Sequence, residues 1–93
     1  MNTLKCQKCG GDVPIPDLPT EVRKDVAAIA HRVGRSQATL ELKNRGGFGL
    51  GDAKAIVFHI SGADGVCHRC GTNLIKGLEE QACPKCRSLN LVW

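Results

Sequence analysis

Apolar residues recur at helical spacing through the middle of the chain. Between Thr20 and Gly34 they lie three or four positions apart, which predicts a helix that Thr20 caps and Gly34 ends. The residues that set this spacing are Val22, Val26, Ile29, Ala30 and Val33. Ser36 is the expected N-cap of a second helix, which runs to the glycine-containing break at residues 44–47.

A third helix and two extended segments complete the expected elements. The helix begins at about Gly51 and stops at the polar segment 61–65. Residues 11–19 carry three prolines, which exclude a helix and favour a linker or an edge strand. Apolar residues alternate along 89–93, as in a strand with one apolar face.

Three Cys-x-x-Cys pairs interrupt this pattern and account for every cysteine. They are Cys6/Cys9, Cys67/Cys70 and Cys83/Cys86. The last two pairs have the spacing of a zinc ribbon, in which each pair supplies two thiolates to one tetrahedral ion. We expect one structural zinc at Cys67, Cys70, Cys83 and Cys86, since a catalytic zinc normally recruits His or Glu and keeps an open position.

The pair Cys6/Cys9 could supply two ligands to a second zinc, but the chain has no fourth Cys-x-x-Cys pair to supply the other two. One hypothesis keeps the C-terminal quartet, with Cys6/Cys9 either left over or completed elsewhere, by His31, His59 or His68 or by a second copy of the chain in a homodimer. The other two place Cys6/Cys9 in one site with Cys67/Cys70, or with Cys83/Cys86. For His31 and His59 a structural role near a helix end is favoured over ligation, and His68 is expected to face solvent.

Length and composition agree with a metal-stabilised protein. A chain of 93 residues with three aromatic side chains (two Phe, one Trp) has little to fill a core, so metal or cross-links are expected to support it. The first residues lack the apolar core of a signal peptide, and no stretch is long enough to span a membrane. Together with the cysteine pattern, this predicts a cytoplasmic protein with thiolate ligands rather than disulfides.

The predicted fold is therefore a small α+β metal-bound protein, in which a C-terminal β zinc ribbon accompanies an inserted helical hairpin of two or three helices. Residues 1–19 form an N-terminal zinc knuckle and extended linker. Residues 20–62 form the helical hairpin region, and residues 63–93 form the ribbon.

The segment 47–57, Gly-Phe-Gly-Leu-Gly-Asp-Ala-Lys-Ala-Ile-Val, resembles the Gly-Leu-Gly-Leu-x-x-Ala-Lys-x-x-Val motif in the C-terminal domain of the bacterial ribosomal stalk protein. The resemblance covers roughly residues 22–60, and the glycine-rich turn is its specific part. In that family the helical hairpin presents basic residues to translational GTPases. By position Lys54 matches the motif lysine, and Lys43 matches a basic residue of the preceding helix.

These observations predict a non-catalytic adaptor whose zinc ribbon supports a basic helical surface for a protein partner, with a link to translation through the resemblance. The expected contact residues are Arg32, Arg35, Lys43 and Lys54. The alternative is a nucleic-acid-binding zinc-ribbon protein of transcription or translation, since basic residues also surround the knuckles. The formal charge of +4 is too small to decide between these two functions. The sequence shows no pairing of a nucleophile with a general base, so an enzyme is not expected.

Overall fold

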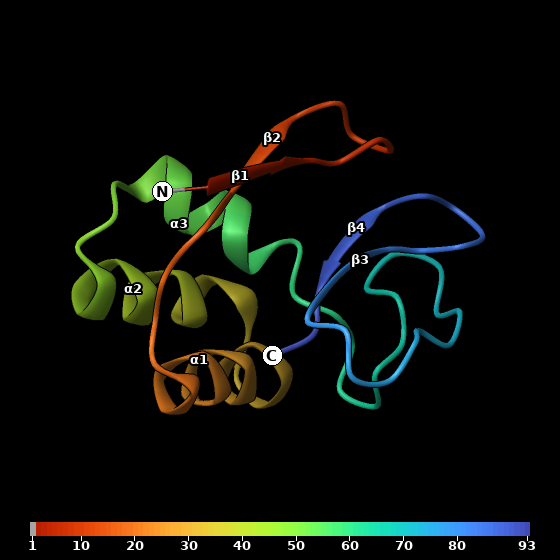
Figure 1. The fold of residues 1–93 in the computed structure, drawn as a ribbon. Helices are drawn as coiled ribbons and strands as arrows, with labels where there is room; N and C mark the ends of the chain where they lie inside the picture. The colour runs from red at the N-terminus through yellow and green to blue at the C-terminus, as the bar shows by residue number, and fades with distance from the viewer. Residues whose placement is uncertain (1) are drawn as a thin grey trace.

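The computed structural model describes residues 2–93, in which three helices lie beside two small antiparallel sheets (Figure 1). In chain order the elements are β1 (Asn2–Lys5), β2 (Asp12–Ile15), α1 (Thr20–Arg32), α2 (Arg35–Gly46), α3 (Leu50–Val57), β3 (Glu80–Ala82) and β4 (Leu89–Leu91). β1 pairs with β2, and β3 pairs with β4. The coarse prediction of a small α+β protein with two or three helices is confirmed, and the described residues have three.

The helices begin differently from the prediction. Pro19, rather than Thr20, occupies the N-cap of α1, and Gly34, rather than Ser36, occupies that of α2. Neither position makes a side-chain capping hydrogen bond, so backbone geometry alone defines these helix starts. The predicted break after α2 is confirmed, because Gly47 takes the left-handed conformation (φ 70°) and its amide donates to the Lys43 carbonyl.

The third helix is shorter than the pattern predicted, because α3 ends at Val57 and two further residues continue as a turn. The chain then runs alongside the last strand. The Leu91 amide donates to the His59 carbonyl at 2.7 Å, and the Ser61 amide donates to the Leu91 carbonyl at 2.9 Å. These two bonds attach β4 to the end of α3.

One apolar core joins the helices to both sheets. Its largest fully buried side chains are Leu42, Ile56, Ile60, Leu91, Val13, Val26 and Val57. Each helix and the strands β2 and β4 contribute, so the β1–β2 hairpin and the last strand are held against the helices by burial of apolar surface. Figure 1 shows the hairpin lying over α3, with β3 and β4 beside it.

The prediction of alternating exposure in the last strand is wrong. Leu89, Asn90 and Leu91 are all buried. Asn90 is tolerated there because its side chain is hydrogen-bonded to its surroundings, as described below.

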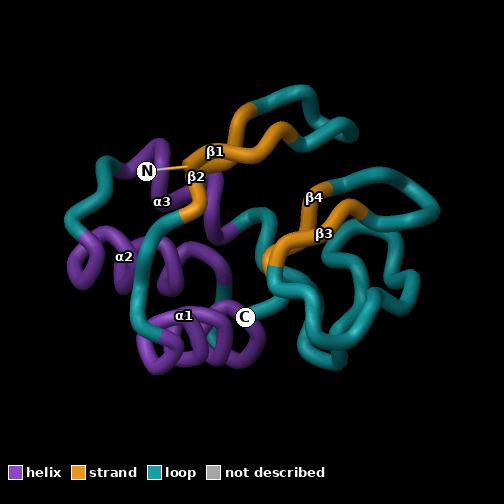
Figure 2. The backbone as a smooth tube through the Cα atoms, in the orientation of Figure 1, coloured by secondary structure: helices purple, strands orange, loops and turns teal. Residues whose placement is uncertain are grey.

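The segment between α3 and β4 contains little regular structure (Figure 2). Within it only β3 is a named strand, and Val66 and Asn73 form an isolated bridge, so the regular strands of the region predicted as a zinc ribbon are limited to β3 and β4. Its small buried cluster consists of Cys67, Leu74 and Cys83. So few apolar contacts leave this segment dependent on another source of stability.

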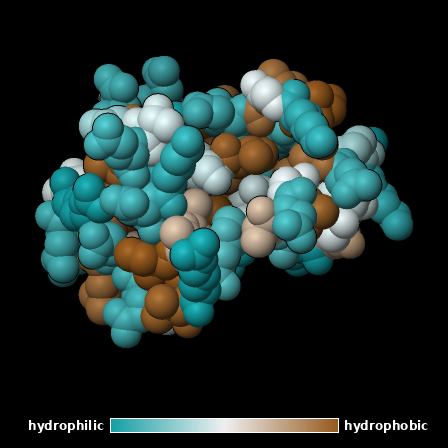
Figure 3. Space-filling view, turned by 90° about the horizontal axis from the view of Figure 1, so that it is seen from below, coloured by the Kyte–Doolittle hydropathy of each residue, from teal (hydrophilic) through white to brown (hydrophobic). Residues whose placement is uncertain are grey.

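The face of the molecule seen from below is mainly hydrophilic, with separate apolar patches (Figure 3). Within residues 2–93, none of the helices has the length and apolar character needed to cross a membrane.

Candidate metal centres

All three Cys-x-x-Cys segments fold into the same backbone knuckle. In each, the amide of the first cysteine donates to the carbonyl five residues later, at 2.9, 2.8 and 2.8 Å in chain order. The amide that follows the second cysteine donates back to the carbonyl of the first, at 2.7, 3.0 and 2.9 Å. The residue in that position has positive φ every time: 78° at Gly10, 79° at Gly71 and 67° at Arg87.

The two C-terminal knuckles bring four sulfurs together. The Sγ atoms of Cys67 and Cys86 lie 3.6 Å apart, and those of Cys70 and Cys83 lie 3.5 Å apart. Thiolates bound to one tetrahedral zinc at about 2.3 Å would be roughly 3.8 Å apart, whereas a disulfide needs about 2.05 Å. The four sulfurs, all within 4.8 Å of one another, therefore form a cluster that could hold a metal ion.

Hydrogen bonds around this cluster favour the thiolate form. The Cys67 sulfur faces the Arg69 amide and the side-chain amide of Asn90, each at 3.4 Å. The Thr72 hydroxyl lies 3.1 Å from the exposed Cys70 sulfur. The hydrogen bonds from Thr72 lower the pKa of Cys70 from 9.0 to about 6. The Ser88 amide lowers the pKa of Cys86, but burial and hydrogen bonds to the other three cysteines outweigh it and raise that pKa to about 11, so Cys86 would lose its proton on binding a metal.

The N-terminal knuckle lies against the end of α3. Cys6 is buried, Cys9 is exposed, and the Cys9 sulfur is 3.5 Å from Nε2 of His59. The ligand atoms of these three residues all lie within 4.8 Å of one another, which makes a second group that could hold a metal ion. Of the arrangements left open by the sequence, the structure has the C-terminal quartet, with Cys6/Cys9 beside a histidine.

The three histidines lie in different surroundings. Nε2 of His31 is 2.7 Å from the Ser61 carbonyl, away from both cysteine groups. His68 is half-buried, with Nε2 at 2.9 Å from the Ser88 hydroxyl and 3.1 Å from the Leu89 carbonyl. The expectation that His68 faces solvent is therefore wrong, because the start of β4 covers its ring.

Sequence reasoning missed the residues that surround the cysteines. Asn90 donates to the Cys67 sulfur, and its carbonyl oxygen accepts the His68 amide at 3.0 Å. The Leu89 amide points at the Cys6 sulfur at 3.4 Å. The position of Asn90 between two leucines of a predicted strand was a signal that could have identified it as a buried polar residue. No sequence signal could have identified the Leu89 amide, because every residue except proline has one.

The four expected partner-binding residues divide into two groups. Arg32, Lys43 and Lys54 are exposed. Arg35 is half-buried, and its guanidinium donates to the carbonyls of Val57 and Ile60 at the end of α3. The structure thus gives Arg35 a role in holding α2 against α3.

An apolar groove of about 370 Å³ lies between α2 and α3. Its lining residues are Ser36, Thr39, Leu40, Leu50, Lys54 and Phe58. Leu40, Leu50 and Phe58 are 49%, 56% and 45% exposed, which is high for large apolar side chains. The Lys54 ammonium lies 5.7 Å from the centre of the Phe58 ring, so a positive charge stands at this groove.

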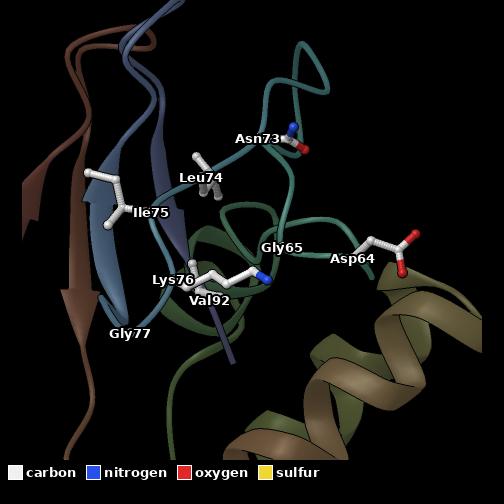
Figure 4. A pocket seen from close by; sticks show the side chains of 8 residues that line it. All are labelled: Asp64, Gly65, Asn73, Leu74, Ile75, Lys76, Gly77 and Val92. Carbon is white, nitrogen blue, oxygen red and sulfur yellow. The ribbon is translucent and has the colours of Figure 1, made fainter.

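A larger cavity, of about 540 Å³, lies next to the cysteine-rich segment (Figure 4). Residues 73–77 form one side, and Asp64 and Gly65 come from the facing turn. Asp64 and Lys76 are its charged lining residues, and no cysteine or histidine belongs to the lining. The cavity is therefore separate from both candidate metal groups.

No protein-family model, curated protein or solved structure matches the chain. Its function has to be inferred from the geometry of the two cysteine groups and of the groove.

Proposed function

We propose that the protein is a non-catalytic zinc-binding adaptor, in which residues 63–93 form a zinc ribbon and the α2–α3 groove binds an acidic, amphipathic segment of a protein partner. The observation that carries this proposal is the exposed apolar groove beside Lys54. Three large apolar side chains gathered on one surface indicate an interaction site more strongly than scattered ones do.

Zinc is the metal that best suits the C-terminal quartet. Four thiolates at tetrahedral spacing are typical of structural zinc sites, and the ligand set leaves no open position for a reacting water. The zinc would supply the stability that the small cluster of Cys67, Leu74 and Cys83 cannot, and so would hold the segment that follows α3 in place.

The charge around the groove supports an acidic partner. Lys54 lines the groove, and Lys43 lies three residues after Leu40 and four after Thr39, on the same side of α2. Both lysines are exposed, and neither forms an ion pair within residues 2–93. An amphipathic partner helix would place apolar side chains in the groove and carboxylates beside these lysines. The resemblance to the stalk protein makes a translational GTPase the first partner to try.

The test uses a photo-crosslinking amino acid at position 40 in the wild-type background and in two charge-reversed variants. The first variant, Leu50→Asp/Lys54→Glu, changes the groove. The second, Leu78→Asp/Lys76→Glu, makes the same changes at exposed residues outside it, with Leu78 48% exposed against 56% for Leu50. Crosslinking is done with and without prior nuclease treatment, and mass spectrometry identifies the joined peptide.

We expect the joined peptide to be acidic and apolar, and its yield to fall at least tenfold in the groove variant but not in the matched control. Equal loss in both variants would contradict a specific groove. Loss of every crosslink on nuclease treatment, with salt-dependent retention of generic RNA or DNA, would instead support the nucleic-acid-binding alternative.

A further inference from the structure

The group of Cys6, Cys9 and His59 has the dimensions of a metal site. The Cys9 sulfur and Nε2 of His59 are 3.5 Å apart. A tetrahedral zinc with a sulfur at about 2.3 Å and a nitrogen at about 2.05 Å would place them roughly 3.6 Å apart. The knuckle has the same backbone hydrogen bonds as those of the C-terminal quartet, so it presents its two sulfurs in the same way.

The His59 ring is oriented as a metal ligand. Its Nδ1 is 2.6 Å from the Ala55 carbonyl, and because a carbonyl can only accept, Nδ1 must carry the proton. In the neutral ring Nε2 then has the free lone pair, and Nε2 is the atom that faces Cys9. A second hydrogen bond that fixes the tautomer and direction of the ring is a regular feature of metal-bound histidines.

The Cys6 sulfur also lies among donors. The amides of Leu89 and Cys9 point at it from 3.4 and 3.5 Å, and the Ser88 hydroxyl lies at 3.8 Å. These donors come from the knuckle itself and from the start of β4, far apart in the sequence. They favour a buried thiolate, which would otherwise be costly.

We propose that Cys6, Cys9 and His59 bind a second zinc ion, and that His68 is its fourth ligand. The ring centres of His59 and His68 are 5.5 Å apart at an interplanar angle of 65°. Two imidazoles on one tetrahedral zinc have centres about 5 Å apart, given zinc–nitrogen bonds of about 2.05 Å. Nε2 of His68 donates to the Leu89 carbonyl, which leaves the lone pair on Nδ1. The ring nitrogens of His68 lie outside the 4.8 Å group of Cys6, Cys9 and His59, so ligation requires the His68 ring to move toward that group.

This centre would lie within a single chain, so it requires no second copy. It would join the N-terminal knuckle, the end of α3 and the C-terminal segment, three parts of the fold that are far apart in the sequence. Because His68 directly follows Cys67, a ligand of the quartet, the two metal ions would be bound by neighbouring residues.

The test is metal loading with zinc and with cobalt(II), using wild type, Cys9→Ser, His59→Ala and His68→Ala. His31→Ala is the matched control, since His31 bonds only to the Ser61 carbonyl within residues 2–93. Native mass spectrometry counts the ions per chain. Cobalt(II) absorption distinguishes a four-sulfur site from one with two sulfurs and two nitrogens. The quartet's spectrum reports in every variant whether the C-terminal segment is folded, and circular dichroism reports whether the helices are.

We expect two ions per wild-type chain and per His31→Ala chain. Cys9→Ser and His59→Ala should weaken the second ion at least tenfold while the quartet stays filled. His68→Ala should also weaken it about tenfold and change its cobalt spectrum, since water would replace a nitrogen ligand. A single ion in folded wild type would overturn the second centre, and an unchanged spectrum in His68→Ala would overturn the assignment of the fourth ligand.

Discussion

Arg87 takes a backbone conformation for which glycine is suited. In the other two knuckles the matching residues are Gly10 and Gly71, with nearly the same φ. In the left-handed region a Cβ atom lies too close to the following carbonyl oxygen, which destabilises the folded state by about 1–2 kcal/mol per residue. The third knuckle therefore carries a strain that the first two avoid.

Arg87→Gly should stabilise the protein and Gly71→Ala should destabilise it, each by about 1 kcal/mol, since glycine's greater unfolded-state entropy offsets part of the relieved strain. Arg87 follows Cys86 and Gly71 follows Cys70, so each substitution lies next to one ligand of the quartet and the two variants are matched in their distance from the metal. Thermal denaturation of the zinc-loaded protein measures the difference, with the Tm of Arg87→Gly expected several degrees above that of wild type. A lower Tm for Arg87→Gly would show that the Arg87 side chain contributes more than its backbone costs.

At the scale of elements, the pair β3–β4 connects the C-terminal quartet to the rest of the fold. Gln81 and Asn90 are directly paired and both buried, yet their amides have different partners. Asn90 bonds to the Cys67 sulfur and to the His68 amide. Gln81 bonds instead to the backbone of Ile75 and Leu78, in the turn that precedes β3.

Asn90→Leu should release metal from the quartet at least tenfold faster, because it removes a hydrogen bond to a ligand and leaves the His68 amide without its acceptor. Gln81→Leu is the matched control. Both variants should lower the free energy of unfolding by about 1–3 kcal/mol, since each removes buried hydrogen bonds. Gln81→Leu should nevertheless leave the rate of metal release nearly unchanged. Stopped-flow transfer of zinc to a chromogenic chelator gives both rates. Equal acceleration in the two variants would mean that Asn90 acts only through general stability.

The elements also show how far the sequence could predict the site. Cys-x-x-Cys spacing is a local signal, so the three knuckles and the quartet could be read from it. The approach of His59 to Cys9 depends on the β1–β2 hairpin packing over α3, across 50 residues of chain. Helical periodicity located the helices but not their N-caps, because Pro19 and Gly34 begin α1 and α2 through backbone geometry without a capping side chain.

At the scale of the whole molecule, the apolar core and the ligands of the C-terminal quartet support different parts of the chain, whereas Cys6 of the second candidate group belongs to the larger core. The larger core contains residues from every helix, together with Leu89 and Leu91 of β4. The segment between α3 and β4 has only Cys67, Leu74 and Cys83 buried in its own cluster, and two of these three are candidate metal ligands. Stability in this segment should therefore depend on metal, while the helices depend mainly on burial of apolar surface.

Removing metal with a chelator at neutral pH should therefore open the chain locally. Hydrogen exchange measured by mass spectrometry should show at least tenfold faster exchange for the knuckle amides, including those of Cys67 and Cys83, whose bonds to backbone carbonyls shape the ligand loops. Amides within α1, α2 and α3 should keep most of their protection, because their core contains no ligand of the quartet. The control is chelator already saturated with zinc. A uniform loss of protection would mean that the metal and the apolar core form one cooperative unit, in which the helices cannot remain folded without the metal ligands in place.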